Sequence, residues 1–216
     1  MTTNQFSIFK PLTACVVFAL SLLCCANSFA QLPPSPTLQN PVTELQTIVN
    51  QTQQAVQTER DSISNNPDQL NQLVRKNLLP YMAIDRMAAT ALGPKWSTAT
   101  PQQKTDFIEQ FTYMLTRAYA SALLKADQYQ VVIYPLRTNS WQTATQMTLP
   151  GTVTASGTGE SSSVTYYVVR VGNNWKIYDF ALEGVSVMQN FQAQLQGFPT
   201  MDTVLKRIQQ VNAGQG

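Results

Sequence analysis

Side chains that could carry catalysis are scarce in this 216-residue chain. It has no histidine, and all three of its cysteines lie within the first 25 residues. Ser186, in the sequence EGVSV at 183–187, resembles half of the Gly-x-Ser-x-Gly turn of hydrolases. The second glycine is absent, however, and no imidazole can activate the hydroxyl. Since the thiolate and imidazole ligands of zinc sites are also missing after residue 25, we expect no enzyme activity, no metal and no cofactor.

The residues that could instead bind a ligand are apolar, and many lie in the stretch 91–124. Thr100-Pro101 predicts the start of a helix there, with Gln103 placed as in a capping box. Apolar side chains then recur at spacings of three and four as far as Leu123, which is typical of a helix with one broad apolar face. That face either covers an ordinary hydrophobic core or walls a cavity for an apolar ligand, and periodicity does not separate the two.

Helices are predicted on both sides of a strand-rich region. The first begins at Asn40-Pro41 and the second after Asn66-Pro67, and a third runs through 84–92 to a stop at Gly93-Pro94. Two further helices are predicted at 187–195 and 201–211.

Between these helices lie the predicted strands: 130–134, a polar segment within 142–155, and a hairpin of 163–171 with 175–182. We expect the polar segment to be an edge or bulged strand because it contains Pro150-Gly151. In the last strand, simple alternation predicts Tyr178, Phe180 and Leu182 on one face. It puts Trp175, Ile177 and Asp179 on the other. The element order predicts an α+β fold with N-terminal helices, an antiparallel sheet of about four strands, and C-terminal helices.

Residues 1–30 have the pattern of a secretory signal peptide. An apolar run from Leu12 to Leu23 follows a lysine, and small residues precede a cleavage point after Ala30. A lipoprotein alternative at Cys24 or Cys25 lacks the small residue that normally precedes the acylated cysteine. We therefore predict a signal peptide over 1–30, a Pro-rich tether over 31–40 and one domain over 41–212.

Charge and composition argue against some classes of partner. Lys and Arg number 14 against 12 for Asp and Glu, so the chain is close to neutral. Scattered charges of both signs argue against nucleic acid and against strong attraction to anionic lipid. With 44% hydrophobic and 12% charged residues, the chain suits one domain with a sizeable core.

Several short motifs, spread over most of residues 40–212, form a pattern. They are Leu92-Gly93 with Trp96, Pro101 with Gln103, Phe107 with Phe111, Trp175 with Tyr178-Asp179, and Glu183-Gly184-Val185-Ser186. This pattern resembles the MlaC or toluene-tolerance auxiliary family, the periplasmic phospholipid carriers of Gram-negative bacteria. One departure is Gln192, which stands where the family usually has an arginine.

The resemblance implies a helical layer and a curved antiparallel sheet, loosely like the nuclear-transport-factor fold, around a deep apolar pocket. It implies a soluble periplasmic carrier that shuttles diacyl phospholipid between outer- and inner-membrane complexes and so maintains outer-membrane lipid asymmetry. The implied partners are an inner-membrane MCE-domain protein of an ABC transporter complex and an outer-membrane lipoprotein–porin complex. We expect a monomer whose phospholipid is cargo rather than cofactor.

Fifteen residues are predicted to bind lipid, and we expect roughly half of them to touch it, because each also suits an ordinary core. Asp179 and Glu183 are expected to be structural, as caps of the helix that follows them. The competing function is a non-enzymatic envelope adaptor with a filled core. The fifteen are Leu92, Trp96, Phe107, Phe111, Met114, Tyr119, Val132, Tyr134, Tyr167, Val169, Tyr178, Phe180, Val187, Met188 and Phe191.

Overall fold

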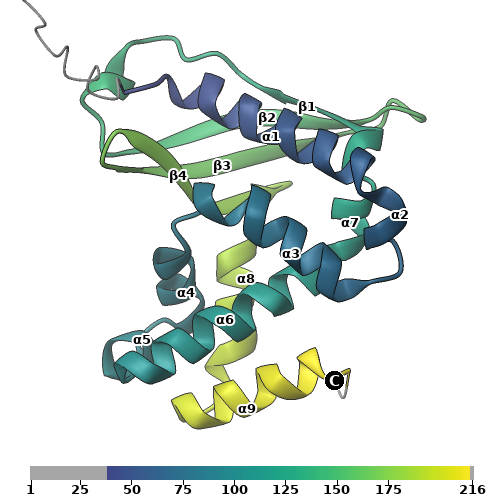
Figure 1. Cartoon of the computed structure of the whole chain (residues 1–216). Coiled ribbons are helices and arrows are strands. Elements are labelled where there is room, and N and C mark those ends of the chain that lie inside the picture. The colour runs from purple at the N-terminus through teal and green to yellow at the C-terminus, as the bar shows by residue number, and fades with distance from the viewer. Residues whose placement is uncertain (1–37, 215–216) are drawn as a thin grey trace, which may run out of the picture. The chain divides into compact units, whose positions relative to one another are not determined.

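The computed structural model describes residues 38–214. The predicted signal peptide, its cleavage after Ala30 and most of the predicted tether lie outside this range. Within it the fold is α+β, as predicted, with helices, then an antiparallel sheet, then helices along the chain (Figure 1). No helix in this range is long and apolar enough to span a bilayer.

The helices precede and follow the sheet in sequence. The strands are β1 (Tyr129–Ile133), β2 (Gln146–Ala155), β3 (Ser161–Val171), β4 (Asn174–Leu182) and β5 (Val185–Ser186). The α-helices are α1 (Pro41–Thr58), α2 (Arg60–Ile63), α3 (Pro67–Asn77), α4 (Ile84–Leu92), α5 (Lys95–Thr98), α6 (Pro101–Ala118), α7 (Ala120–Leu124), α8 (Val187–Gln196) and α9 (Met201–Asn212). Short 3₁₀ turns are η1 (Leu79–Tyr81), η2 (Ala126–Gln128) and η3 (Ser140–Gln142).

Side-chain caps fix where the main helices begin. Asn40 and Asn66 accept hydrogen bonds from backbone N–H groups in the first turns of α1 and α3. Thr100 and Gln103 form the predicted capping box at the start of α6. The predicted starts are confirmed, because each helix has a side-chain acceptor for N–H groups that the helix itself leaves unpaired.

The long apolar helix is shorter than predicted. It ends at Ala118, and Tyr119 (φ −106°, ψ 11°) departs from helical geometry before the chain resumes as α7. Ala122 and Leu123, which lie in α7 beyond this break, both line the cavity described below.

The sheet has the order β1-β2-β3-β4-β5, so β2 is an inner strand. The prediction that this segment is an edge or bulged strand is wrong, since β2 pairs without a register shift on both sides. The Pro150 carbonyl accepts from the Tyr134 N–H (2.9 Å), just past the end of β1. The N–H that proline lacks would point to the same side, where β1 has ended, so Pro150 is tolerated in this inner strand. Gly151 is required there, because a Cβ would lie 2.4 Å from the Val132 carbonyl oxygen.

A β-bulge in β4 changes which of its side chains share a face. Pairing with β3 moves from Tyr167–Asp179 to Val168–Ile177, which leaves Tyr178 as the extra residue. Because Tyr166 and Val168 share a face of β3, their partners Phe180 and Ile177 also share one. The predicted separation of Ile177 from Phe180 is therefore wrong.

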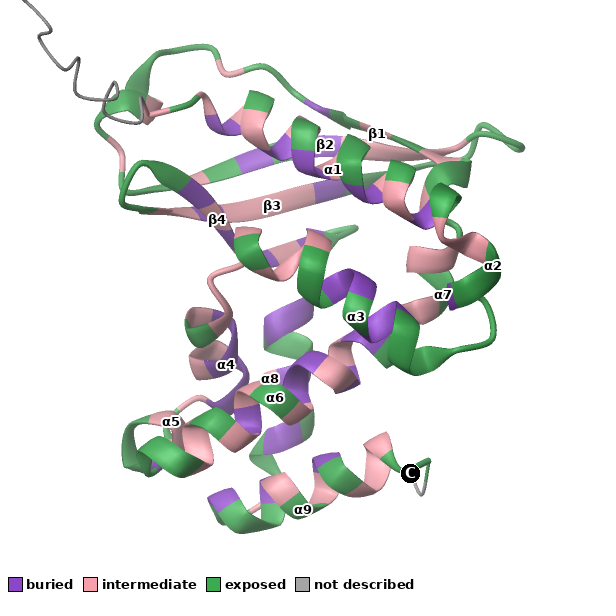
Figure 2. Ribbon diagram, viewed as in Figure 1, coloured by how far each residue is buried: buried purple, intermediate pink, exposed green. Residues whose placement is uncertain are grey.

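Buried residues form three clusters, of which the two larger are described here (Figure 2). One fills the space between α4, α6, α8 and α9, where the rings of Phe107 and Phe111 stack at 5.1 Å and Phe191 meets Phe111 edge-on at 5.4 Å. The other joins Leu45 of α1 to the sheet face that carries Val168 and Ile177, here called the inner face. The α1 helix thus packs on the sheet, while α6, α8 and α9 pack on one another.

Candidate functional site

An apolar cavity of about 730 Å³ lies between the inner face, α1, and the helices α3, α6 and α7. This volume falls within the range of ligand pockets, roughly 300–1,000 Å³. The sheet contributes Val153, Val164, Tyr166, Ile177, Phe180 and Leu182, α1 contributes Leu45, Ile48, Val49 and Thr52, and the other helical segments contribute Val74, Leu78, Leu115, Thr116, Tyr119 and Leu123.

The threonines in the cavity wall turn their hydroxyls toward their own helices. Thr52 donates to the Ile48 carbonyl (2.8 Å), Thr112 to Ile108 (2.7 Å) and Thr116 to Thr112 (2.9 Å). These bonds satisfy the hydroxyl donors without a ligand, so the wall suits a hydrocarbon rather than a polar molecule.

Two of the three tyrosines that line the cavity, Tyr119 and Tyr166, have a pKa above the ordinary value and remain neutral under physiological conditions. Burial raises the pKa of Tyr166 to about 12. Burial also raises the pKa of Tyr119, and the negative charge of Asp179 adds to the effect. Each shift has the sign expected when an ionisable group leaves water, so neither phenol introduces charge into the cavity.

The cavity reaches solvent at one end of the sheet. Its exposed lining residues are Glu160 and Ser162, where β2 turns into β3, together with Leu182 and Ala122. Leu182 is 39% exposed although it also lines the cavity, so apolar surface continues from the interior to the opening.

Only two of the fifteen predicted lipid-binding residues, Tyr119 and Phe180, line this cavity. Trp96 and Tyr178 pack at the margin of the cluster between α4, α6, α8 and α9. Seven others belong to the buried interior of that cluster: Leu92, Phe107, Phe111, Met114, Val187, Met188 and Phe191.

The remaining four predicted residues occupy the sheet face opposite the inner face. Val132 and Tyr134 are 41% and 43% exposed there. Tyr167 and Val169 alternate with Tyr166 and Val168 along β3, so they point away from the cavity as well.

Two helix stripes explain what sequence reasoning missed. On α6, Phe107, Phe111 and Met114 face the filled cluster, while Leu115 and the following Tyr119 line the cavity. The apolar stripe of α1 was visible as Leu45, Ile48 and Val49, but nothing in its spacing indicates that it lies over a hollow.

Asp179 and Ser186 build the start of α8. The Asp179 carboxylate accepts from the Met188 N–H (3.1 Å) and from the Ser186 hydroxyl, and Ser186 Oγ accepts from the Gln189 N–H (3.1 Å). The predicted capping role of Asp179 is confirmed. Glu183 instead accepts from the Ser163 N–H (2.6 Å) at the edge of β3, so its predicted role as a helix cap is wrong.

Gln192 lies against the end of α4. A Cβ added to Gly93 would come within 2.6 Å of the Gln192 Nε2 atom, so this amide packs directly against the glycine. Gly93 also has φ +58°, as the predicted helix stop requires. The contact is one of the points at which α8 packs on α4.

Comparison with known proteins places these features in a family context. Residues 46–211 match the family model described as MlaC protein. The intermembrane phospholipid transport system binding protein MlaC of Haemophilus influenzae is 24% identical over 161 residues, covering 72% of this chain and 74% of that protein. The toluene tolerance protein ttg2D of Pseudomonas putida is 23% identical over 136 residues, covering 62% and 61%.

A solved structure has the same fold. It is a phospholipid-binding protein from Ralstonia solanacearum in complex with a phospholipid, and it matches with a TM-score of 0.74 and 24% identity. The match covers 82% of this chain and 99% of the other.

Proposed function

The chain belongs to the MlaC family, and from this premise we propose that it is a periplasmic phospholipid carrier. It takes diacyl lipid between outer- and inner-membrane complexes and so maintains the lipid asymmetry of the outer membrane. A signal peptide cleaved after Ala30 would export it. The single observation that carries the proposal is the apolar cavity of about 730 Å³, whose threonine hydroxyls donate to carbonyls of their own helices.

A carrier is needed because acyl chains are very unfavourable in water. A diacyl lipid has roughly 30 methylenes, and at about 0.8 kcal/mol each their exposure to water costs on the order of 25 kcal/mol. Free diffusion through an aqueous compartment is therefore negligible. Enclosing the tails in the cavity removes the free-energy cost of exposing them to water. Transport by this route needs no covalent step.

The acyl chains would contact the inner face and the two helical walls. We assign tail contacts to Tyr119 and Phe180, from the predicted set, and to Ile48, Val164 and Leu182, which line the same cavity. Leu182, at the opening, would meet the end of the tails nearest the head group.

The proposed partners are those implied by membership of the family, and they are not argued from any surface of this chain. They are the MCE-domain protein of an inner-membrane ABC transporter complex and an outer-membrane lipoprotein–porin complex. Each would exchange lipid with a monomeric carrier.

Organic extraction and mass spectrometry of the purified protein test the proposal. We expect about one phospholipid per chain, or more, after purification from a Gram-negative host. Protein that yields no phospholipid, and takes none from vesicles, would instead support an envelope adaptor.

A further inference from the structure

The hydroxyl of Tyr166 is a hydrogen-bond donor in an apolar part of the cavity wall. Tyr166 lies in β3, the central strand of the sheet, and its side chain lines the cavity. Its cross-strand partners on the inner face are Leu149 and Phe180. Burial raises the pKa of this phenol to about 12, so its surroundings solvate charge poorly.

This hydroxyl has no hydrogen-bond partner within residues 38–214. It is also not one of the fully enclosed side-chain atoms that lack a partner in this range, so it borders free space, which is the cavity. Buried polar groups of proteins are almost always paired with protein, water or ligand. Because tails that fill the cavity exclude water, the acceptor for this hydroxyl must then come from the lipid.

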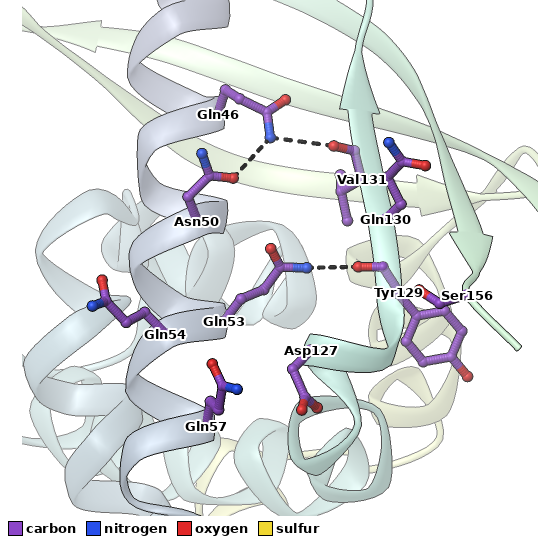
Figure 3. Close-up of a pocket in the computed structure, with 10 residues that line it drawn as sticks. All are labelled: Gln46, Asn50, Gln53, Gln54, Gln57, Asp127, Tyr129, Gln130, Val131 and Ser156. Carbon is purple, nitrogen blue, oxygen red and sulfur yellow. Dashed lines mark hydrogen bonds between the residues drawn. The ribbon is translucent and has the colours of Figure 1, made fainter.

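Other donors in the cavity wall are already engaged within the protein. The wall threonines donate to their own helices. Gln53 Nε2 donates to the carbonyls of Ala126 (2.9 Å) and Tyr129 (2.7 Å). Beside it, in the polar groove of about 510 Å³ between α1 and β1, Gln46 Nε2 donates to the Val131 carbonyl (3.2 Å) (Figure 3). These amides therefore stabilise the packing of α1 on β1 and are not free to bind cargo.

The two other tyrosines of the cavity have more polar surroundings. Tyr129 begins the edge strand β1 and also lines the polar groove. Tyr119 lies between α6 and α7, where the negative charge of Asp179 contributes to its raised pKa. Burial alone raises the pKa of Tyr166, so that phenol is the one held in an apolar environment without a charged neighbour.

The position of Tyr166 along β3 suits a particular acceptor of a diacyl lipid. Val164 pairs with Leu182 at the opening, and Tyr166 with Phe180 forms the next pair on the inner face, about 7 Å further in. The acceptors of a diacyl phospholipid that lie nearest its tails are the two ester carbonyls. Among the described lining residues only Glu160, at the exposed opening, is charged, so a phosphate would have no cationic partner at this depth.

We propose that the Tyr166 hydroxyl donates a hydrogen bond to an ester carbonyl of the bound phospholipid and so selects ester-linked over ether-linked tails. The inference rests on the proposed carrier function. An ether-linked lipid of the same chain length fills the cavity equally but has no carbonyl oxygen. It would leave the hydroxyl unpaired, which is unfavourable in a closed apolar site.

The test crosses one variant with two lipids. Delipidated wild type and Tyr166→Phe are incubated with vesicles that contain equal amounts of ester-linked and ether-linked phosphatidylglycerol with matched chains, and the bound lipids are extracted and counted. Phenylalanine keeps the ring, and no partner within the described residues is lost. The matched control is Tyr167→Phe, which removes a hydroxyl from the opposite sheet face.

The wild type and the control should enrich the ester lipid by about threefold to tenfold, the net effect of one hydrogen bond. Tyr166→Phe should bind the ether lipid as the wild type does, with a ratio near one. A wild type without preference overturns the assignment and leaves the carrier function intact, as does a Tyr166→Phe variant that keeps the preference. Equal weakening of both lipids in Tyr166→Phe would indicate a bond to the phosphate and also overturns it. A wild type that binds neither lipid overturns the carrier function itself.

Discussion

The ring of Tyr119 meets the ring of Phe180 edge-on, with centroids 5.9 Å apart and planes at 65°. Tyr119 follows α6 and Phe180 lies in β4, so the contact joins helix to sheet. Both residues line the cavity, and both also pack against the filled cluster of α4, α6, α8 and α9. The pair thus lies at the boundary between the filled cluster and the cavity.

A charge at the cavity opening should reduce lipid binding. In Leu182→Glu a carboxylate replaces a side chain that lines the cavity, and we expect lipid occupancy to fall about tenfold because an ionised group is poorly tolerated against acyl chains. Val185→Glu is the matched control, since Val185 pairs with Leu182 in the same hairpin, is 61% exposed and does not line the cavity. Equal occupancy in two folded variants would remove Leu182 from the proposed tail path.

Tyr166 should titrate far above an ordinary tyrosine. Its pKa is raised to about 12 by burial, against an ordinary value of 10.0. The neutral phenol therefore supports the fold fully below pH 10, and this support is lost as pH rises from 10 toward 12. Phenolate absorbance should show a step near pH 12 that disappears in Tyr166→Phe and persists in Tyr167→Phe, on the opposite sheet face.

Ionisation of Glu44 should lower the stability of the fold as pH rises above about 4.5. Burial raises its pKa, and the hydrogen bond from the Trp175 N–H to Oε2 (3.2 Å) only partly opposes this. Because the folded pKa lies above the unfolded one, the contribution to stability is present below pH 4.5 and is lost as pH rises through the folded pKa.

In Glu44→Gln the amide oxygen can still accept from Trp175, and no charge forms. Urea denaturation should therefore show a gain in stability at pH 7 and little change at pH 4. Glu109→Gln, at an exposed position on α6, serves as the control. A variant that loses stability at both pH values would contradict the stated cause.

Removing the Asp179 carboxylate should destabilise the fold strongly. The residue is 7% exposed and accepts from the N–H groups of Phe180 and Met188 and from the Ser186 hydroxyl. Asp179→Ala leaves the buried Met188 donor unpaired, which should cost roughly 2–4 kcal/mol. Ser186→Ala removes a single cap and should cost about 1 kcal/mol. Denaturant midpoints that reverse this order would show that Ser186, and not Asp179, holds the start of α8.

The sequence predicted well what depends on local chemistry. Asn40, Asn66 and the Thr100–Gln103 capping box mark helix starts by hydrogen bonds within one turn, and Gly93 marks a helix end by its backbone conformation. These signals need no knowledge of the rest of the chain. The α+β order followed from them and from the hairpin.

What escaped prediction depends on contacts between distant segments. The bulge at Tyr178 changes the face of Ile177 relative to Phe180, and alternation along one strand carries no sign of it. Phe111 and Tyr119 follow one apolar stripe, yet one is in the filled cluster and the other lines the cavity. The type and spacing of apolar residues predict that a side chain is buried. They do not predict whether other side chains or a cavity lie next to it.

The side chains of Gln46 and Gln53 also determine what can happen at the free edge of the sheet. An outermost strand is ordinarily a template on which a neighbouring molecule can add its own strand, and repeated addition leads to aggregates. Here two carbonyls of β1 are already engaged by α1. A second molecule could extend the sheet here only after breaking these side-chain hydrogen bonds, which hinders polymerisation along β1 in a concentrated solution of the protein.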